Sequence, residues 1–473
     1  MLIMKKMTVL VAMAMATSGG WAQAGTTIKL DKEGTRKLEI GADEQLRVEN
    51  YSRAIMMTGG PQYTDANRGP DYQYFRMRER VWGKLTLSPD IFVYGRLAHR
   101  WQYYTSRPGI NNINTVPQGA STWRFPDEVV LDNLYLNLDK VGGSNWSLRL
   151  GRFDLTDGPK NDPVFGNGML FKDGTGRDGG RTAGMDGILA TWKGEKDTIR
   201  LAGLYGTQED WISPLNDKER VVRRGDTWVG GGAWTHTFAK AFKTEAYFFH
   251  FEIKDPLSDR ENAQLEVPGL RIFGDLHPLV DYSVEYARQF GTYQNNVVGG
   301  PMKQASGFML DARLNLKTPE GTTWQPVLKL QYTLFSGDHG GTGGFEGWHP
   351  VLGDGALYRE ECYYIINGAG RWTNLHQYRA SLDMTVLPGD AKRGNVGKLQ
   401  VAPGWASLHA DRGETGGGLG GGTHYGEMPT LFVDYQVTKW WKASLQTAYF
   451  IAGDYYKPSR NGAWVRLEMT FTF

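Results

Sequence analysis

Residues 461–473 alternate strictly between apolar and polar side chains. One face of this segment carries Ala463, Val465, Leu467, Met469, Phe471 and Phe473, and the other carries Trp464, Arg466, Glu468, Thr470 and Thr472. A period of two predicts a β-strand with one apolar side, because successive side chains of a strand point to opposite faces. The edge strand of a soluble sheet and a strand that faces lipid share this pattern, so the rest of the chain has to decide between them.

Residues 1–24 have the three parts of a secretory signal. Lys5 and Lys6 form a basic start, residues 7–16 are mostly apolar, and Ala22-Gln23-Ala24 has the small residues of a cleavage site. We expect cleavage after Ala24 and export from the cytoplasm. Because the signal holds two lysines and no acidic residue, the remaining chain has as many acidic as basic residues. This balance argues against nucleic acid as a partner.

The exported chain is polar on average but rich in glycine and aromatic residues, with 62 Gly, 23 Tyr, 20 Phe and 16 Trp. No stretch after the signal approaches the ~20 apolar residues of a membrane helix. A membrane β-barrel can have a polar average, because only every second residue faces lipid. The single Cys362 excludes an intramolecular disulfide. Two soluble domains are the usual expectation for this length, and one barrel domain over residues 25–473 is the alternative.

Alternating segments recur along the whole chain, and we count about eighteen, with bounds uncertain by a few residues. Links after odd-numbered segments are mostly long, and links after even-numbered segments are mostly short. Outer-membrane barrels have short periplasmic turns and long external loops, whereas a soluble sandwich has no reason to sort its loops. We therefore predict an all-β transmembrane antiparallel barrel in the bacterial outer membrane. Trp324–Phe335 is assigned to a strand, and residues 253–267 and 410–428 are assigned to loops.

Charged residues fall on one face of the predicted strands. In residues 72–87, Arg76, Arg78 and Arg80 alternate with the apolar Phe75 and Met77. An Arg or Lys that faces lipid at mid-depth costs ~2–4 kcal/mol, so we expect this face to line a water-filled lumen. The expected pore-lining cations are Arg76, Arg78, Arg80, Lys84, Arg96, Arg100 and Arg149.

These cations have two interpretations. A narrow passage lined by one sign of charge concentrates the opposite ion, and guanidinium groups bind carboxylates in a bidentate manner. This indicates a channel for an acidic solute, such as a uronate. Alternatively, the arginines are tied to acidic residues of external loops and stiffen a general diffusion porin. The sequence leaves both interpretations open.

Three short motifs resemble the alginate-export family of bacterial outer-membrane porins. They are Leu148-Arg149-Leu150-Gly151-Arg152, Tyr332–Asp338 with the downstream Gly344-Phe345, and Gly453-Asp454-Tyr455-Tyr456. The terminal Phe473 likewise resembles the insertion signal of outer-membrane barrels. The resemblance implies one barrel of eighteen strands, export of an anionic polysaccharide through an electropositive constriction, a monomer in contact with outer-membrane lipid, and periplasmic export partners. It also implies that the constriction includes Arg76, Arg78, Arg80, Arg100 and Arg149.

Other chemistry has less support in the sequence. Ser336, Asp338 and His339 are residue types of a hydrolase, which is the alternative from another functional class. They lack a Gly-x-Ser-x-Gly motif, and Ser, Gly and Asp are common turn formers. Asp154, Asp157, Asp162, Asp173 and Asp178 do not have the spacing of a calcium loop. The nine His residues form no His-x-x-x-His motif, so we expect no metal, no cofactor and no enzymatic activity.

Overall fold

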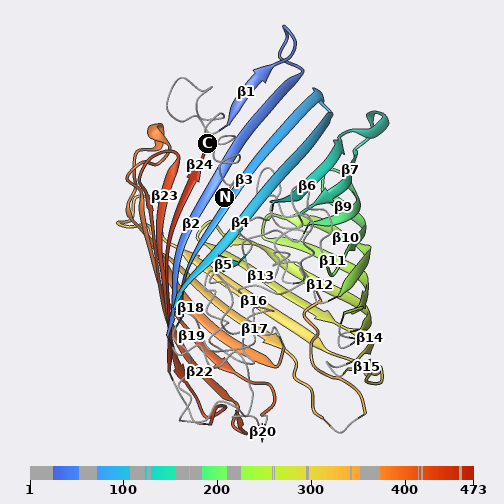
Figure 1. Cartoon of the computed structure of the whole chain (residues 1–473), viewed down its shortest axis with the longest axis vertical. Coiled ribbons are helices and arrows are strands. Elements are labelled where there is room, and N and C mark those ends of the chain that lie inside the picture. Colours follow the sequence, from blue (N-terminus) through green and yellow to red (C-terminus); the bar gives the residue numbers. More distant parts are fainter. Residues whose placement is uncertain are drawn as a thin grey trace.

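The computed structural model is a closed antiparallel β-barrel (Figure 1). It describes residues 25–52, 72–106, 123–124, 129–154, 170, 184–209, 225–257, 259, 262–294, 298–340, 343–351, 373–413, 415–416, 419–457 and 461–473. The predicted signal, residues 1–24, lies outside these ranges. Within the described residues no helix is long and apolar enough to cross a bilayer.

Eighteen of the described strands form the barrel wall. They are β2 (Lys37–Ser52), β3 (Tyr72–Ser88), β4 (Ile91–Ser106), β6 (Val129–Leu138), β7 (Trp146–Phe153), β8 (Met185–Lys193), β9 (Asp197–Gly206), β10 (Asp226–Ala239), β11 (Phe242–Lys254), β12 (Ala263–His277), β13 (Val280–Arg288), β16 (Phe308–Lys317), β17 (Val327–Phe335), β18 (Leu375–Leu387), β19 (Leu399–His409), β22 (His424–Gln436), β23 (Trp441–Ala452) and β24 (Gly462–Thr472). Short strands extend the sheet or pair in loops: β1 (Thr26–Lys29), β5 (Trp123–Arg124), β14 (Phe290–Tyr293), β15 (Lys303–Ala305), β20 (Thr415–Gly416) and β21 (Leu419–Gly420).

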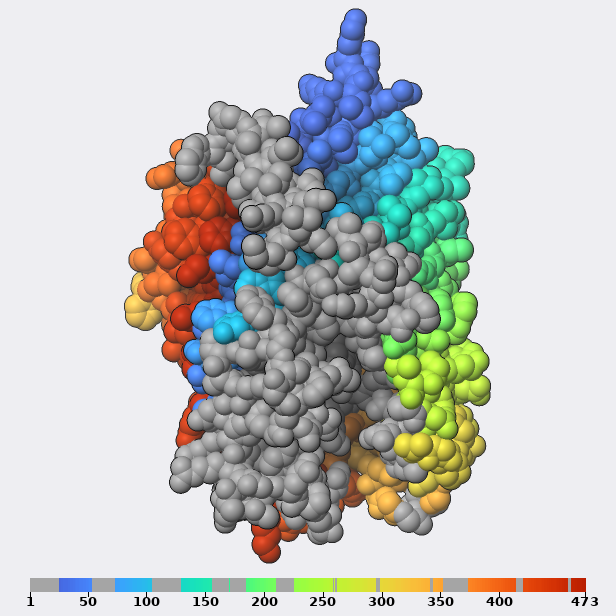
Figure 2. Space-filling model, in the orientation of Figure 1, coloured from blue at the N-terminus to red at the C-terminus, as the bar shows by residue number. Residues whose placement is uncertain are grey.

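The barrel closes where β24 pairs with β2. At the end of this seam the backbone N–H of Phe473 donates to the carbonyl of Ala42 at 2.7 Å, and the N–H of Ala42 donates to the carbonyl of Phe473 at 2.9 Å. Figure 1 shows the red β24 beside the blue β2, and in Figure 2 red and blue surfaces adjoin on the left of the molecule. The seam therefore joins the two ends of the described chain.

The sorting of links by length confirms the predicted topology. Strands β3 and β4 are joined by Pro89-Asp90, and β10 and β11 by Lys240-Ala241. These short turns lie at the same end of the barrel as the start of β2 and the end of β24, because every strand is antiparallel to its neighbours. The longest links, such as residues 53–71, start from the other end. That end is external if the short turns are periplasmic.

The alternation of faces is also confirmed. On β24, Leu467 is 52% exposed on the outside, whereas Trp464 and Arg466 are at most 2% exposed on the inside. On β3, Phe75 is 40% exposed and Arg76 is 3% exposed. The apolar set therefore faces outward, and the charged set faces the lumen.

Three predicted strand bounds are wrong. Strand β12 already starts at Ala263, and β22 already starts at His424, although both starts were assigned to loops. Ala263, Leu265 and Val267 alternate correctly, but Pro268 hides the pattern, and β22 contains the turn-like Gly426 and Pro429. Trp324 belongs to a turn with a φ of 64°, not to β17.

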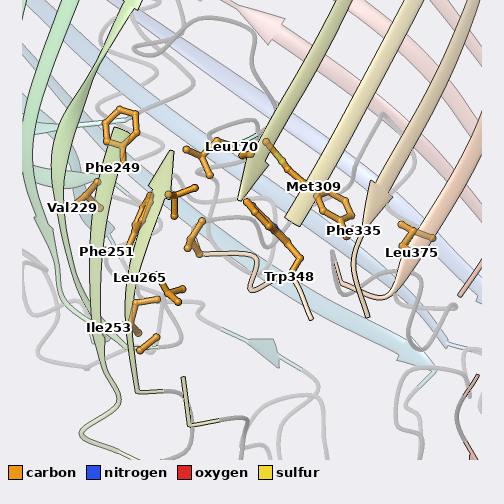
Figure 3. Packing of buried hydrophobic residues seen from close by; sticks show 14 of the residues in the cluster. Leu170, Val229, Phe249, Phe251, Ile253, Leu265, Met309, Phe335, Trp348 and Leu375 are labelled. Carbon is orange, nitrogen blue, oxygen red and sulfur yellow. The ribbon is translucent and has the colours of Figure 1, made fainter. Parts of the chain in front are cut away.

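Apolar side chains cover the lumen face of one wall in its external half (Figure 3). Phe249 and Phe251 from β11 and Leu265 from β12 are fully buried there. Links between strands reach this cluster, since Leu170 and Trp348 belong to it. Trp348 packs on Phe335 of β17 with ring centroids 6.2 Å apart. The described part of the long link after β17 therefore folds back into the barrel.

Candidate functional site

The structure places all seven predicted cations on one arc of the lumen wall. Strand β3 carries Arg76, Arg78, Arg80 and Lys84, strand β4 carries Arg96 and Arg100, and strand β7 carries Arg149. Strands β2, β3, β4, β6 and β7 are consecutive in the wall. Arg76 and Arg100 are buried on the lumen face. The other five side chains point to the same face, because they alternate in step with these two along their strands and across the strand pairs.

Like charges stand directly opposite each other on this arc. Arg78 of β3 is the register partner of Arg100 of β4. Arg47 of β2 is the register partner of Arg76 of β3. Like charges at directly opposed positions destabilise a sheet, so this arrangement has a folding cost that neutral residues would avoid.

Carboxylates from neighbouring strands partly offset the positive charge. Asp43 of β2 lies 2.9 Å from Nε of Arg80 and 3.5 Å from Nη2 of Arg78. One carboxylate thus lies beside two guanidinium groups.

A second shared carboxylate lies at the seam of the barrel. Glu49 is completely buried, and its Oε2 accepts hydrogen bonds from Arg466 Nη2 at 3.0 Å, the Tyr51 hydroxyl at 3.1 Å and Trp464 Nε1 at 3.3 Å. Its Oε1 lies 3.8 Å from Nη2 of Arg76. Glu49 therefore compensates Arg76 and Arg466 together.

The remaining predicted cations have different surroundings. Nε of Arg96 donates to Asp132 at 2.6 Å, and its Nη2 lies 3.8 Å from Asp154. Lys84 lies 3.9 Å from Glu39. The guanidinium of Arg149 lies over an aromatic ring, 4.7 Å from the centroid of Tyr135, which is a cation–π contact.

Sequence reasoning missed Arg47, Arg466 and most of the acidic partners. Arg47 pairs with Glu468 across the seam, and Asp43 and Glu49 come from β2. Their alternation within residues 38–51 was visible, but no local signal says which residue of β2 lies beside which residue of β3 or β24. Among the described residues, Asp43 and Glu49 of β2 and Asp132 of β6 are acidic partners from neighbouring strands, and most residues of the external loops next to this arc lie outside the described ranges.

The wall far from the seam also carries ion pairs on its lumen face. Strands β10 to β13 are farthest from the seam in the strand order. Arg271 of β12 lies 3.3 Å from Glu245 of β11, and the Tyr247 hydroxyl donates to Glu285 of β13 at 2.9 Å. Beyond this paired region, the apolar cluster of Figure 3 covers the external half. Glu245 also lies 3.8 Å from Arg200 of β9, so shared carboxylates occur on both walls.

The residues of the alternative hydrolase are in structural roles. The Ser336 hydroxyl donates to the carbonyl of Glu346 at 2.8 Å and accepts the N–H of Phe308 at 2.9 Å. Asp338 accepts the N–H of Glu346, and His339 faces the Glu346 carboxylate at 3.3 Å. A nucleophile needs its hydroxyl within reach of a base, whereas these contacts fasten a turn. Of the calcium alternative, Asp154 touches Arg96, and Asp157, Asp162, Asp173 and Asp178 lie outside the described residues.

A sequence model described as alginate export matches residues 67–466. The chain belongs to the alginate export family. Together with the closed barrel, this places the protein in the bacterial outer membrane as a β-barrel porin. Among curated proteins the sequence has no significant match.

Solved outer-membrane channels have a similar fold. The structure of Acinetobacter baumannii OccAB2 matches with a TM-score of 0.54 and 13% identity, over 92% of this chain and 98% of its own. OccAB4 of the same species matches with a TM-score of 0.53 and 11% identity, over 91% and 97%. Pseudomonas aeruginosa OccK8 (OprE) gives 0.53 and 11%, over 92% and 98%. At such identities the likeness shows the fold alone.

Proposed function

We propose that the protein is a passive channel for acidic saccharides or related organic anions, guided by the arginine-rich arc. The path is lined by Arg76, Arg78, Arg80, Lys84, Arg96, Arg100 and Arg149. The observation that carries the proposal is the direct opposition of Arg78 and Arg100 across β3 and β4. Two guanidinium groups that lie side by side on the lumen face suit a carboxylate solute, which such groups bind in a bidentate manner.

The shared carboxylates support the same proposal. Asp43 faces both Arg78 and Arg80, and Glu49 faces both Arg76 and Arg466, so each of these carboxylates lies beside two guanidinium groups of the lumen wall. A lumen wall rich in guanidinium groups attracts anions and repels cations.

The runner-up is a general diffusion porin in which the arginines are structural. It is favoured by the ion pairs that Arg80 and Arg96 make with Asp43 and Asp132. The two functions differ in the role of Arg78 and Arg100. If these arginines are structural, they contribute to stability. If they bind the solute, they lower stability and contribute to selectivity.

The variant R78Q/R100Q separates the two functions. A unit charge ~10 Å from the ion path contributes ~0.4 kcal/mol in water, and ~0.15 kcal/mol at 0.1 M salt after screening. Removing two such charges makes the lumen less favourable for anions and less unfavourable for cations. The ratio of anion to cation permeability should therefore fall about threefold. We expect reversal potentials in planar bilayers with a KCl gradient to show this loss of anion preference, with unfolding unchanged or shifted to higher denaturant.

The matched control is K329Q/D383N, which removes one charge of each sign from a 2.6 Å pair outside the arc and should leave the ratio unchanged. If R78Q/R100Q keeps the wild-type ratio while lowering stability, the arginines are structural and the diffusion porin is the better description. Transport of a uronate oligosaccharide into vesicles then tests the solute class. The monomeric state and periplasmic partners remain predictions, and light scattering of the detergent-solubilised protein tests the first.

A further inference from the structure

Two histidines and a glutamate meet at the external ends of neighbouring strands. His409 is the last residue of β19, and His424 is the first residue of β22. Their rings stack with centroids 4.8 Å apart, and Nε2 of His424 lies 2.9 Å from Oε1 of Glu427. One nitrogen of each imidazole and one oxygen of Glu427 all lie within 4.8 Å of one another.

A β-bulge brings these three side chains together. Ser407 pairs with Glu427 and Leu408 with Gly426, but His409 then pairs with His424, so the register skips Tyr425. Without the skip, His424 and Glu427 would point to opposite faces, because three residues separate them. Gly426 permits the bulge with a φ of 148°, and a Cβ there would lie 2.1 Å from the carbonyl oxygen of Ile451.

The cluster lies on the outer face of the barrel. Glu427 points to the same face of β22 as Leu431, which is 38% exposed. Ser407 points to the same face of β19 as Trp405, which is 48% exposed. By contrast, Tyr425 is fully buried, and its hydroxyl donates to the carbonyl of Asn374. The side chains of His424 and Glu427 are themselves 36% and 27% exposed, so an inorganic ion can reach them.

The carboxylate of Glu427 is held in place by neighbours. Its Oε2 accepts the Nε1–H of Trp405 at 2.6 Å, and its Oε1 accepts the Ser407 hydroxyl at 2.7 Å. Outer partners of this kind orient a ligand and raise the affinity of metal sites. Oε1 therefore points toward the two imidazoles, and Oε2 is occupied by the indole.

We propose that His409, His424 and Glu427 bind one divalent transition-metal ion of the zinc type at the external rim, joining the ends of β19 and β22. Two imidazole nitrogens and one carboxylate oxygen suit Zn²⁺, which takes such ligands at about 2.0–2.2 Å and leaves a fourth position for water. Small rotations of the side chains suffice to shorten the present separations. The ion fastens the base of the link between residues 409 and 424. Local sequence spacing does not reveal the site, because its ligands come from two strands.

The test uses tag-free, EDTA-treated full-length protein in detergent, titrated with Zn²⁺ in competition with a chromophoric chelator. We expect one saturable Zn²⁺ per chain, and binding at least about tenfold weaker in His409→Gln and in His424→Gln. The matched control is His250→Gln. His250 faces Glu266 at 2.7 Å on the exposed surface of β11 and β12, but has no second histidine, so its loss should leave binding unchanged.

A second measurement does not depend on the variants. X-ray absorption at the zinc edge of the wild-type protein should show two imidazole ligands, and Zn²⁺ should raise the unfolding temperature of the wild type but not that of His424→Gln. The proposal is overturned if the wild type binds no saturable Zn²⁺, if His424→Gln binds it equally well, or if His250→Gln lowers binding to the same extent.

Discussion

Replacement of Glu49 by Gln is expected to destabilise the barrel at its seam. Glu49 is completely buried and compensates Arg466, which is 2% exposed, and Arg76, which is 3% exposed. Gln keeps an oxygen that can accept from Tyr51 or Trp464, but it removes the negative charge. Breaking a buried ion pair from one side costs about 3–5 kcal/mol, because the remaining charge stays buried without compensation. We expect the free energy of unfolding to fall by about 3 kcal/mol, toward the lower end of that range.

The assay is reversible urea unfolding in lipid vesicles, followed by tryptophan fluorescence. The control is Asp383→Asn, which removes the partner of Lys329 in a pair of 2.6 Å whose side chains are 37% and 48% exposed. Exposed pairs contribute about 0–1 kcal/mol, so this variant should unfold nearly like the wild type. The double variant E49Q/R466Q should lose less than the sum of the two single variants. Equal stability of E49Q and D383N would refute the reasoning that buried charge holds the seam.

Two further predictions concern the external half of the barrel. Trp348→Ala removes a 2% exposed ring from the apolar cluster; it should cost about 3–5 kcal/mol and raise the single-channel conductance, because the folded-in link loses its anchor. An unchanged conductance would mean that Trp348 does not narrow the passage. At the rim, burial raises the pKa of Asp411, but the Gly337 N–H, His376 and Arg412 outweigh it and hold that pKa below its ordinary value. The stabilisation is therefore complete above the ordinary carboxyl pKa and is lost as the pH falls through the lowered pKa. Asp411→Asn should thus unfold at a lower temperature than the wild type at pH 7, and the two unfolding temperatures should converge in acid. If they stay apart in acid, the ionised carboxylate is not the cause of the lost stability.

The sequence predicts the periodic part of this fold well. Leu467 and Arg466 were assigned to opposite faces from their parity alone, and the short turn Pro89-Asp90 identified one end of the barrel. Alternation and turn chemistry are local properties, so a single chain displays them. The starts of β12 and β22 were missed because proline and glycine within those strands carry the same local signal as a loop.

The chemistry of the candidate site depends on register, which no local pattern contains. That Arg78 stands opposite Arg100, and that Asp43 lies beside Arg80, follows only from how β2, β3 and β4 align. A shift of one residue would send each of these side chains to the other face. The bulge at Gly426 is a change of register of this kind, and it decides which side chains meet at the rim.

The ion cluster around Glu49 has a consequence for the order of assembly. Glu49 and Arg466 are 417 positions apart, so they meet only when residues 462–472 reach β2. Until then, a partly built sheet exposes an acidic residue and its basic counterparts at an open edge, where lipid solvates charge poorly. We therefore expect the entry of these groups into the bilayer to be coupled to the pairing of β24 with β2.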